Sequence, residues 1–376
     1  MQFRDLAKQY QVLKADIDKA MVDVASQAHY IMGPQVKELE RELAEYVGVK
    51  HCLTCANGTD ALTLALKAWG IGPGDAVFVP DFTFFSSAEV VSLEGATPVF
   101  VDVDSDTYNI DVESLEAVIR KTVAEGKLTP KVIVTVDLFG QPANYPLVKA
   151  IAKKYNLLIL EDGAQGFGGS IEGRKACSFG DISTTSFFPA KPLGCYGDGG
   201  AVFTDNDEWA ALMESYRVHG KGSDKYDNVR IGLNSRLDTM QAAILQVKLR
   251  AFDDEVERVN VVARKYTELL GGHVKTPVVP EGFRSSWAQY TIQLPSEAVR
   301  NNLQAALKEA GIPSMVYYPK MMHEQTAFNQ SGAADHSYCN DYVASRLCRV
   351  VLSLPMHPYL ETSDIENICA TLIASL

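Results

Sequence analysis

Residues 157–165 read Leu-Leu-Ile-Leu-Glu-Asp-Gly-Ala-Gln, an apolar run that ends in two carboxylates and a glycine. Three further short apolar runs lie at residues 76–79, 98–101 and 131–136. Near-continuous apolar strands separated by helical segments are typical of a mainly parallel sheet that is covered on both faces. The sequence therefore predicts an α/β fold, in which ligands bind at the carboxyl ends of the strands.

The segments around these runs predict the rest of the framework. Two helices are expected between about residues 12 and 47, with a break at Gly33-Pro34, and another helix over 57–69. Further along we expect a long helix over 239–270, a strand over 288–294, a helix near 299–310, a strand near 314–318 and a final helix near 365–376. This order predicts a large α/β domain over 1–238, N-terminal helices included, and a linking helix with a smaller α+β domain over 239–376.

The composition narrows the class of protein. The chain has 376 residues, 47% of them hydrophobic, and a formal net charge of -12. An acidic balance argues against a broad nucleic-acid-binding face. The first residues, Met-Gln-Phe-Arg-Asp, lack the pattern of a secretory signal, and no apolar run approaches the roughly 20 residues that a membrane helix needs. We expect a soluble, cytoplasmic protein without membrane or nucleic-acid partners.

The cysteines do not indicate a metal site. Their odd number, seven, and their scattered positions suggest reduced thiols. Cys52 and Cys55 form a C-x-x-C, but no second pair of cysteines or histidines follows at the spacing of a structural zinc site. We therefore expect these two to be buried structural thiols and no metal to be bound.

A helix start offers one candidate anion site. The stretch Ala56-Asn-Gly-Thr-Asp60 opens the predicted helix at 57–69, where free backbone N–H groups and the helix dipole favour an anion. Gly58 would let a phosphate approach the backbone closely, and Thr59 would add a hydroxyl donor. Taken without other signals, an ordinary helix cap is the better explanation of this stretch.

Two further residues carry chemistry. Asp162 follows a predicted strand, where a carboxylate can hold a positively charged ring nitrogen or simply cap the next helix. Lys191 lies in Ser186-Phe-Phe-Pro-Ala-Lys-Pro-Leu-Gly, among apolar residues and glycines with almost no other charge nearby. A desolvated lysine has a lowered pKa and is a competent Schiff-base nucleophile.

Several motifs together resemble one known family. Asn57-Gly-Thr-Asp-Ala-Leu, Asp162-x-x-Gln165, Ser186-x-x-x-x-Lys191 and Gly197-Asp-Gly-Gly-Ala-Val occur in the order typical of the DegT/StrS family of nucleotide-sugar aminotransferases. The resemblance runs nearly end to end, from Tyr30-Ile-Met-Gly-Pro to Ser353-Leu-Pro-Met-His-Pro358. It implies a fold-type-I enzyme dependent on pyridoxal 5′-phosphate (PLP), with a seven-stranded-type sheet in its large domain.

The resemblance also implies roles for individual residues. Lys191 would hold PLP as a Schiff base and shuttle a proton, and Asp162 would keep the pyridine nitrogen protonated. The remaining implied cofactor contacts are to the phosphate (Gly58, Thr59 and Ser186), the phenolic oxygen (Gln165) and the ring face (Phe84, which could otherwise be a core aromatic). Asn234 matches a residue that the family lends to the partner subunit's phosphate site, which implies a homodimer. Relatives that remove a sugar hydroxyl carry His in place of this Lys, so transamination is favoured.

The substrate implied by the resemblance is a keto-sugar nucleotide, with L-glutamate as the amino donor. Asn234-Ser-Arg-Leu-Asp238 and the Lys191 segment are similar to members that aminate C3 of UDP-linked sugars, including those that make 3-amino-glucuronate derivatives. Arg236 is then a candidate contact for a carboxylate or phosphate, or else an internal partner of Asp238. Tyr318 and His323 keep the places of pocket residues in the family's small domain.

One departure from the family bears on the sugar pocket, and three alternatives stay open. Tyr317 and Met321-Met322 differ from the usual His-Tyr-x-x-Pro-Leu-His pattern of that segment. The alternatives are amination at C4, a PLP enzyme such as a lyase that acts on amino acids only, and a non-catalytic PLP-binding regulatory protein. The last would need a DNA-binding element, and neither a basic helix-turn-helix nor a basic balance is visible.

Overall fold

A seven-stranded sheet forms the centre of the protein. The computed structural model describes residues 1–224, 226–331 and 343–376. The strand order is β1-β9-β8-β5-β4-β2-β3, and only β9 runs antiparallel to its neighbours. The strands are β1 (His51–Cys55), β2 (Asp75–Pro80), β3 (Thr97–Val101), β4 (Thr129–Val136), β5 (Leu158–Asp162), β8 (Ile182–Ser186) and β9 (Gly200–Thr204). The prediction of a mainly parallel α/β sheet is confirmed.

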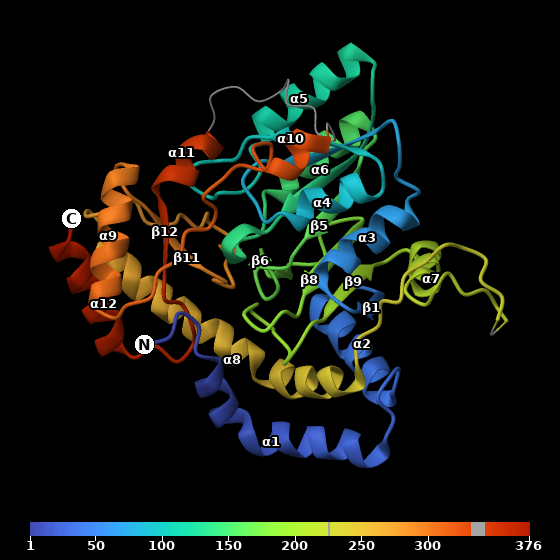
Figure 1. Cartoon of the computed structure of the whole chain (residues 1–376), viewed down its shortest axis with the longest axis horizontal. Helices are drawn as coiled ribbons and strands as arrows, with labels where there is room; N and C mark the ends of the chain where they lie inside the picture. Colours follow the sequence, from blue (N-terminus) through green and yellow to red (C-terminus); the bar gives the residue numbers. More distant parts are fainter. Residues whose placement is uncertain (225, 332–342) are drawn as a thin grey trace.

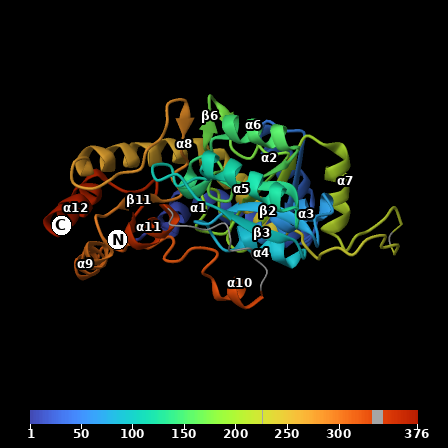
Figure 2. The same cartoon turned by 90° about the horizontal axis from the view of Figure 1, so that it is seen from above.

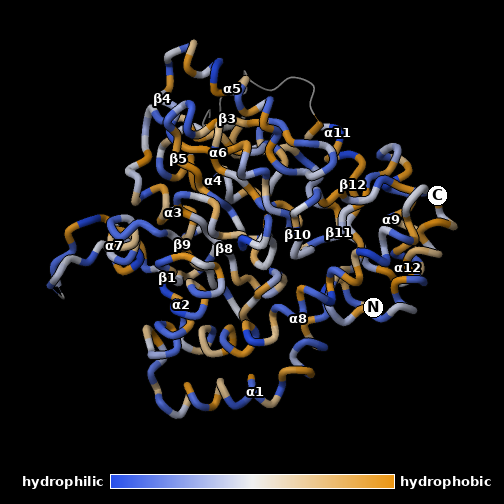
Figure 3. Tube along the Cα trace, turned by 180° about the vertical axis from the view of Figure 1, so that it is seen from behind, coloured by the Kyte–Doolittle hydropathy of each residue, from blue (hydrophilic) through white to orange (hydrophobic). Residues whose placement is uncertain are grey.

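Helices cover both faces of this sheet, as the apolar strands require (Figure 1). Along β2, Val77 and Val79 pack toward α3 (Gly58–Ala68) and α4 (Ser86–Leu93). The alternate residues Ala76 and Phe78 pack toward α5 (Val112–Glu125) and α6 (Tyr145–Tyr155). In Figure 3 the hydrophobic segments accordingly concentrate in the central strands. The strands whose ends carry the site are therefore buried between two layers of helices.

The C-terminal part forms a second, smaller core. β11 (Tyr290–Gln293) and β12 (Val351–Leu354) pair antiparallel and pack against the end of α8 (Thr239–Leu270). Helices α9 (Glu297–Glu309) and α12 (Thr362–Ala374) complete this core, and α1 (Leu6–Gln27) lies along α8. The other elements are α2 (Pro34–Val47), η1 (Leu138–Gly140), β6 (Ser170–Ile171), β7 (Arg174–Lys175), α7 (Asp207–Tyr216), β10 (Phe283–Arg284), α10 (Thr326–Ser331) and α11 (Val343–Val350). The division into domains at residues 238 and 239 stays a prediction, although α8 begins there.

Two expectations need correction. The first helix begins at Leu6, well before residue 12, because Asp5 caps it by accepting a hydrogen bond from the Lys8 N–H. The predicted strand near 314–318 is wrong: only Met315 forms a bridge, to Ser353. The chain then turns toward the central sheet, where the Met322 N–H donates to the Asp81 carbonyl at 2.9 Å.

The connection between α7 and α8 projects from the body of the molecule. Figures 1 and 2 show this loop extending beyond α7 in both views. It carries strongly exposed apolar side chains, among them Ile231 at 92% exposure. Among the helices that the structure describes, none is both long and apolar enough to cross a membrane.

Candidate functional site

The carboxyl ends of the parallel strands form one edge, and the predicted site residues follow it. Val136 of β4 pairs with Asp162 of β5, and Asp162 pairs with Thr184 of β8. Asp162 and Ser186 therefore end adjacent strands on the same side of the sheet. This is the edge where an open parallel sheet binds its ligands.

Asp162 is buried at this edge, with only 5% of its surface exposed. Its Oδ2 accepts a hydrogen bond from the Ser87 hydroxyl at 2.7 Å, and its Oδ1 accepts one from the Ala164 N–H at 3.2 Å. Burial raises the pKa of the carboxyl, while these two donors and nearby Lys191 act against that rise. Ser87 was not predicted, since a hydroxyl near a helix start gives no distinctive signal in a sequence.

Lys191 lies in the loop between β8 and β9 and is partly buried. Its N–H donates to the Phe188 carbonyl at 2.8 Å, which closes a turn at the lysine. Burial lowers the pKa of the ammonium; Asp162 opposes this change and Arg4 adds to it. The predicted desolvated lysine and the predicted carboxylate thus lie close enough to interact electrostatically.

The start of α3 lies against the end of β8. Asn57 caps the helix by accepting a hydrogen bond from the Asp60 N–H at 2.8 Å. A Cβ added at Gly58 would lie 2.8 Å from the Cβ of Ser186, so only glycine fits this approach. Gly58, Thr59 and Ser186 are brought together as predicted, beside the free N–H groups of a helix N-terminus.

Aromatic and amide side chains line the same region. Phe84 is 53% exposed, so it is not a core aromatic, and its ring centroid lies 6.3 Å from that of Tyr318. Gln165 donates from Nε2 to the Tyr318 hydroxyl at 3.1 Å, and its Oε1 accepts from the Phe139 N–H at 2.7 Å. Burial raises the pKa of Tyr318 further above neutral pH, so its hydroxyl stays protonated.

His323 is joined to the end of β2. Its backbone N–H donates to Asp81 Oδ1 at 2.9 Å, and its Nδ1 lies 2.5 Å from Asp81 Oδ2. This hydrogen bond raises the pKa of the imidazole. Met321 and Met322, which depart from the family pattern, are buried in the core beside it, whereas Tyr317 is partly exposed.

Asn234 and Arg236 lie at the base of the projecting loop. Ser235 between them accepts a hydrogen bond from the Ala56 N–H at 3.1 Å, which attaches this segment beside the start of α3. The side chain of Asn234 is exposed, and the Arg236 guanidinium donates to it. Among the described residues, the Arg236 guanidinium therefore bonds to Asn234 and not to Asp238, the alternative partner.

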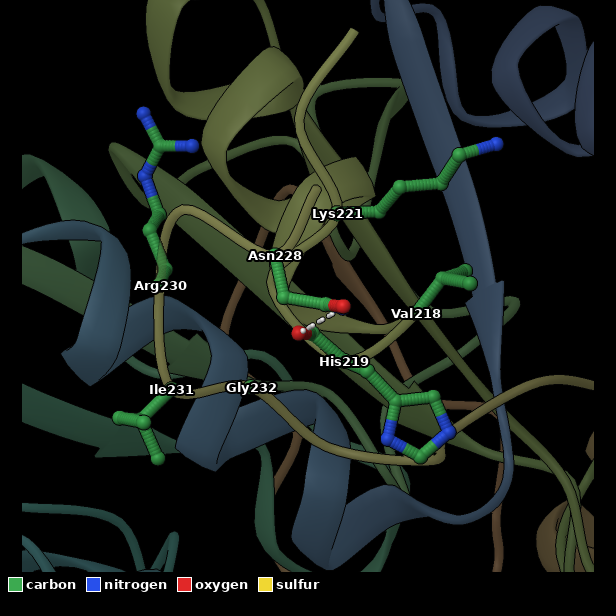
Figure 4. Close-up of a pocket in the computed structure, with 7 residues that line it drawn as sticks. All are labelled: Val218, His219, Lys221, Asn228, Arg230, Ile231 and Gly232. Atoms are coloured by element: carbon green, nitrogen blue, oxygen red, sulfur yellow. Dashed lines mark hydrogen bonds between the residues drawn. The ribbon is translucent and has the colours of Figure 1, made fainter. Parts of the chain in front are cut away.

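The same loop holds an open pocket of about 560 Å³ that sequence reasoning missed (Figure 4). Figure 4 shows Lys221 and Arg230 on opposite sides of it, with the Asn228 amide donating to the His219 carbonyl at 2.9 Å. The other residues lining the pocket are Val218, Ile231 and Gly232. The only hint of this pocket in the sequence is that Lys221, Arg230 and Arg236 lie close together, but their spacing matches no binding motif.

The C-x-x-C pair is divided by the sheet. Cys52 packs in the cluster of α2 and α8, whereas Cys55 packs in the cluster of α3 on the opposite face. Three residues apart on a strand, their side chains cannot share a ligand. The six cysteines that the structure describes are free and buried; Cys339 lies outside the described residues. No group of three metal-ligating side chains gathers in the described part of the chain.

Comparisons with known proteins agree with this geometry. The model of the DegT/DnrJ/EryC1/StrS aminotransferase family matches residues 11–373. A UDP-2-acetamido-2-deoxy-3-oxo-D-glucuronate aminotransferase from Pseudomonas aeruginosa is 43% identical over 99% of each chain. A UDP-N-acetyl-3-dehydro-alpha-D-glucosamine 3-aminotransferase from Acidithiobacillus ferrooxidans is 40% identical, covering 99% of this chain and 97% of the relative. The solved structure of a family member from Brucella abortus is 49% identical, with a TM-score of 0.95 over 100% of this chain and 99% of that one.

The cofactor follows from the relatives and fits the residues present. Similar solved structures include PLP and PMP forms of a sugar aminotransferase from Streptococcus pneumoniae. In this chain, the cradle of Gly58 and Ser186 suits a phosphate, Asp162 suits a pyridinium, and Lys191 suits an aldehyde carbon. The chain is thus a PLP-dependent sugar aminotransferase that belongs to the DegT/DnrJ/EryC1/StrS aminotransferase family.

Proposed function

We propose that the protein transfers an amino group from L-glutamate to C3 of a UDP-linked 3-keto-sugar, with Lys191 and Asp162 as its catalytic residues. The observation that carries this proposal is the meeting of a desolvated lysine, a buried carboxylate and a helix N-terminus at one edge of the sheet. Each of the three is common in proteins by itself. Their convergence matches the three charged or reactive parts of PLP.

The proposed site residues have different roles, according to which part of the cofactor each one would contact. PLP supplies, when bound, the electron sink that makes a substrate C–H bond acidic. Asp162 holds a positive charge at the ring nitrogen, which its burial makes more effective than in water. The other residues bind and orient the cofactor: Gly58, Thr59 and Ser186 at the phosphate, Phe84 at the ring face and Gln165 at the phenolic oxygen, with Asn234 reaching the phosphate site of a partner.

Lys191 moves the proton. Its lowered pKa leaves more of the amine unprotonated at neutral pH, which is the form that attacks an aldehyde carbon and accepts a proton. Nζ of Lys191 carries the proton between the substrate carbon and the cofactor. Glutamate and the sugar use the same site in turn, so the kinetics are ping-pong.

The proposed sugar rests on the names of the relatives and on the cations of the loop. Both UDP-sugar enzymes described above act on 3-oxo sugars by name. Lys221, Arg230 and Arg236 supply positive charge suited to a diphosphate or a carboxylate. Tyr318 and His323, held by Gln165 and Asp81, offer polar groups for the sugar hydroxyls. The product would serve amino-sugar and polysaccharide biosynthesis.

We also infer a homodimer with shared sites. The projecting loop exposes Tyr226, Val229 and Ile231, an apolar surface that is costly in water. Asn234 at the base of the loop is exposed, which leaves it accessible to a partner subunit. A second copy of the chain would cover the loop and receive this residue.

The test is the near-ultraviolet and visible spectrum of the purified protein with PLP, before and after L-glutamate. We expect a band that bleaches with glutamate and is absent in Lys191→Ala. Lys149→Ala is the matched control, since burial also lowers the pKa of Lys149 but this residue lies on α6. A bleaching band that persists in Lys191→Ala would contradict the catalytic assignment.

The product then distinguishes the sugar chemistry. With a UDP-linked 3-keto-sugar, return of the band should accompany an amino group that NMR places at C3. An amino group at C4 would contradict the regiochemistry and leave the lysine assignment standing. Bleaching with no amino-sugar from any UDP-, dTDP- or GDP-linked keto-sugar would favour an enzyme of amino acids only.

A further inference from the structure

A cluster of charged side chains packs against the loop that carries Lys191. It draws residues from three parts of the chain: Arg4 before α1, Lys248 and Glu255 on α8, and Tyr359 before α12. Lys248 donates to the Gly194 carbonyl, and Tyr359 donates to Glu255. None of these residues belongs to the motifs that identify the family. Two of them, Arg4 and Lys248, donate to backbone carbonyls of residues 191–194.

Arg4 makes the most direct contact with the lysine. Its Nη2 donates to the carbonyl of Lys191 at 2.9 Å and to the carbonyl of Pro192 at 3.2 Å. The segment that carries Arg4 is itself held, because the Phe3 carbonyl accepts from the Met356 N–H at 3.0 Å. The guanidinium therefore clamps the main chain of the residue that carries the reactive amine.

Arg4 also acts on Lys191 through its charge. Burial lowers the pKa of Arg4 to about 10, so it stays positively charged at neutral pH. The groups that face Lys191 are Arg4 and Asp162, and they act on its pKa in opposite directions. The other titratable groups facing Arg4 are Glu255 and Lys248 on α8, and His357 and Tyr359 near the C-terminus.

We propose that Arg4 is a positioning residue for Lys191, holding its main chain through two carbonyl hydrogen bonds and destabilising a second positive charge at its Nζ. The proposal rests on the role of Lys191 stated under Proposed function. It makes two separable claims, one about geometry and one about the electrostatic field. Arg4→Met removes both contributions, whereas Arg4→Lys keeps the charge but ends one bond short of the Nη2 atom that donates to both carbonyls.

The electrostatic effect of Arg4 is measured from the pKa of the Schiff base, which is obtained by following the absorbance of the PLP-loaded protein as the pH is changed. Removing a nearby cation favours the protonated Schiff base, so its pKa should rise by about one unit in Arg4→Met. In Arg4→Lys it should stay within about 0.3 units of the unmodified protein. Arg264→Met is the control, since Arg264 is an exposed arginine of α8 that pairs with Glu257, and it should shift nothing.

The geometry is measured by hydrogen exchange of the peptide that contains residues 191–195. Exchange should be several-fold faster in both Arg4 variants and unchanged in Arg264→Met. An unshifted titration with unchanged exchange in Arg4→Met would overturn the proposal. If Arg4→Met does not fold, Arg4→Lys decides: faster exchange at an unchanged titration supports the clamp, and unchanged exchange overturns it. A protein that never forms the band would refute the role of Lys191 instead, so the two failures are distinguishable.

Discussion

The hydrogen bond from Ser87 to Asp162 should contribute measurably to stability. Ser87 is fully buried, Asp162 nearly so, and the two oxygens lie 2.7 Å apart. Hydrogen bonds to charged groups contribute about 1.5–3 kcal/mol, so we expect Ser87→Ala to cost about 2 kcal/mol. The same loss should raise the pKa of Asp162 by about 1.5 units, since one unit corresponds to about 1.4 kcal/mol.

The loss of stability in Ser87→Ala should depend on pH, and the direction follows from the pKa of Asp162. The folded-state pKa of Asp162 is raised by burial and would rise further in Ser87→Ala, so the folded variant holds the charged carboxylate less well. The deficit should be full at pH 8 and shrink as the pH falls through that raised pKa and the carboxyl gains its proton. Denaturant unfolding of the PLP-free protein at pH 8 and pH 5.5, at one fixed concentration, measures the difference.

Ser92→Ala is the matched control for Ser87→Ala. Ser92 lies on the same helix, α4, and its buried hydroxyl has no hydrogen-bond partner among the residues that the structure describes. Its removal should change stability by less than about 0.5 kcal/mol. Equal effects of the two substitutions, or a Ser87→Ala deficit that stays constant between the two pH values, would refute the reasoning.

Two further substitutions test the site. Gly58→Ala places a methyl group 2.8 Å from the Cβ of Ser186, so PLP affinity measured by equilibrium titration should fall at least about tenfold. An unchanged affinity would contradict the assignment of the phosphate to this helix start. Asp81→Asn should lower the pKa of His323 in an NMR titration, because the carboxylate hydrogen bond raises it. The stability lost in Asp81→Asn should be largest below about pH 6.5, where His323 is charged in both the folded and the unfolded state. It should disappear as the pH rises through the folded-state pKa of His323. A loss of stability that does not depend on pH would contradict this pairing.

The strands could be predicted because burial on both faces leaves a direct trace in the sequence. The run that ends at Asp162 has almost no polar residue until its last two positions, which is the pattern expected of a strand covered on both sides. Lys191 was visible for a related reason, since a lone charge among apolar residues and glycines is unusual. Local composition was sufficient for both.

The failures concern contacts between distant segments. The stretch near 314–318 has strand-like composition, but its path is decided by the Met322 bond to the Asp81 carbonyl. Ser87 and Arg4 act through partners 75 and 187 positions away in the chain, which no local pattern encodes. The cationic loop was missed because its residues line one pocket only after the loop has folded back on itself.

The bond between the Phe3 carbonyl and the Met356 N–H joins two residues that are 353 positions apart in the chain. During synthesis, residues 3–5 emerge from the ribosome long before their partner exists, and contacts of such long sequence separation form late. The backbone around Lys191 therefore cannot gain its full set of supports until nearly the whole chain has been made. A growing chain would carry every proposed PLP contact before the Met356 N–H that holds the Arg4 segment has been made. Tight cofactor binding should therefore begin only after residue 356 has been synthesised.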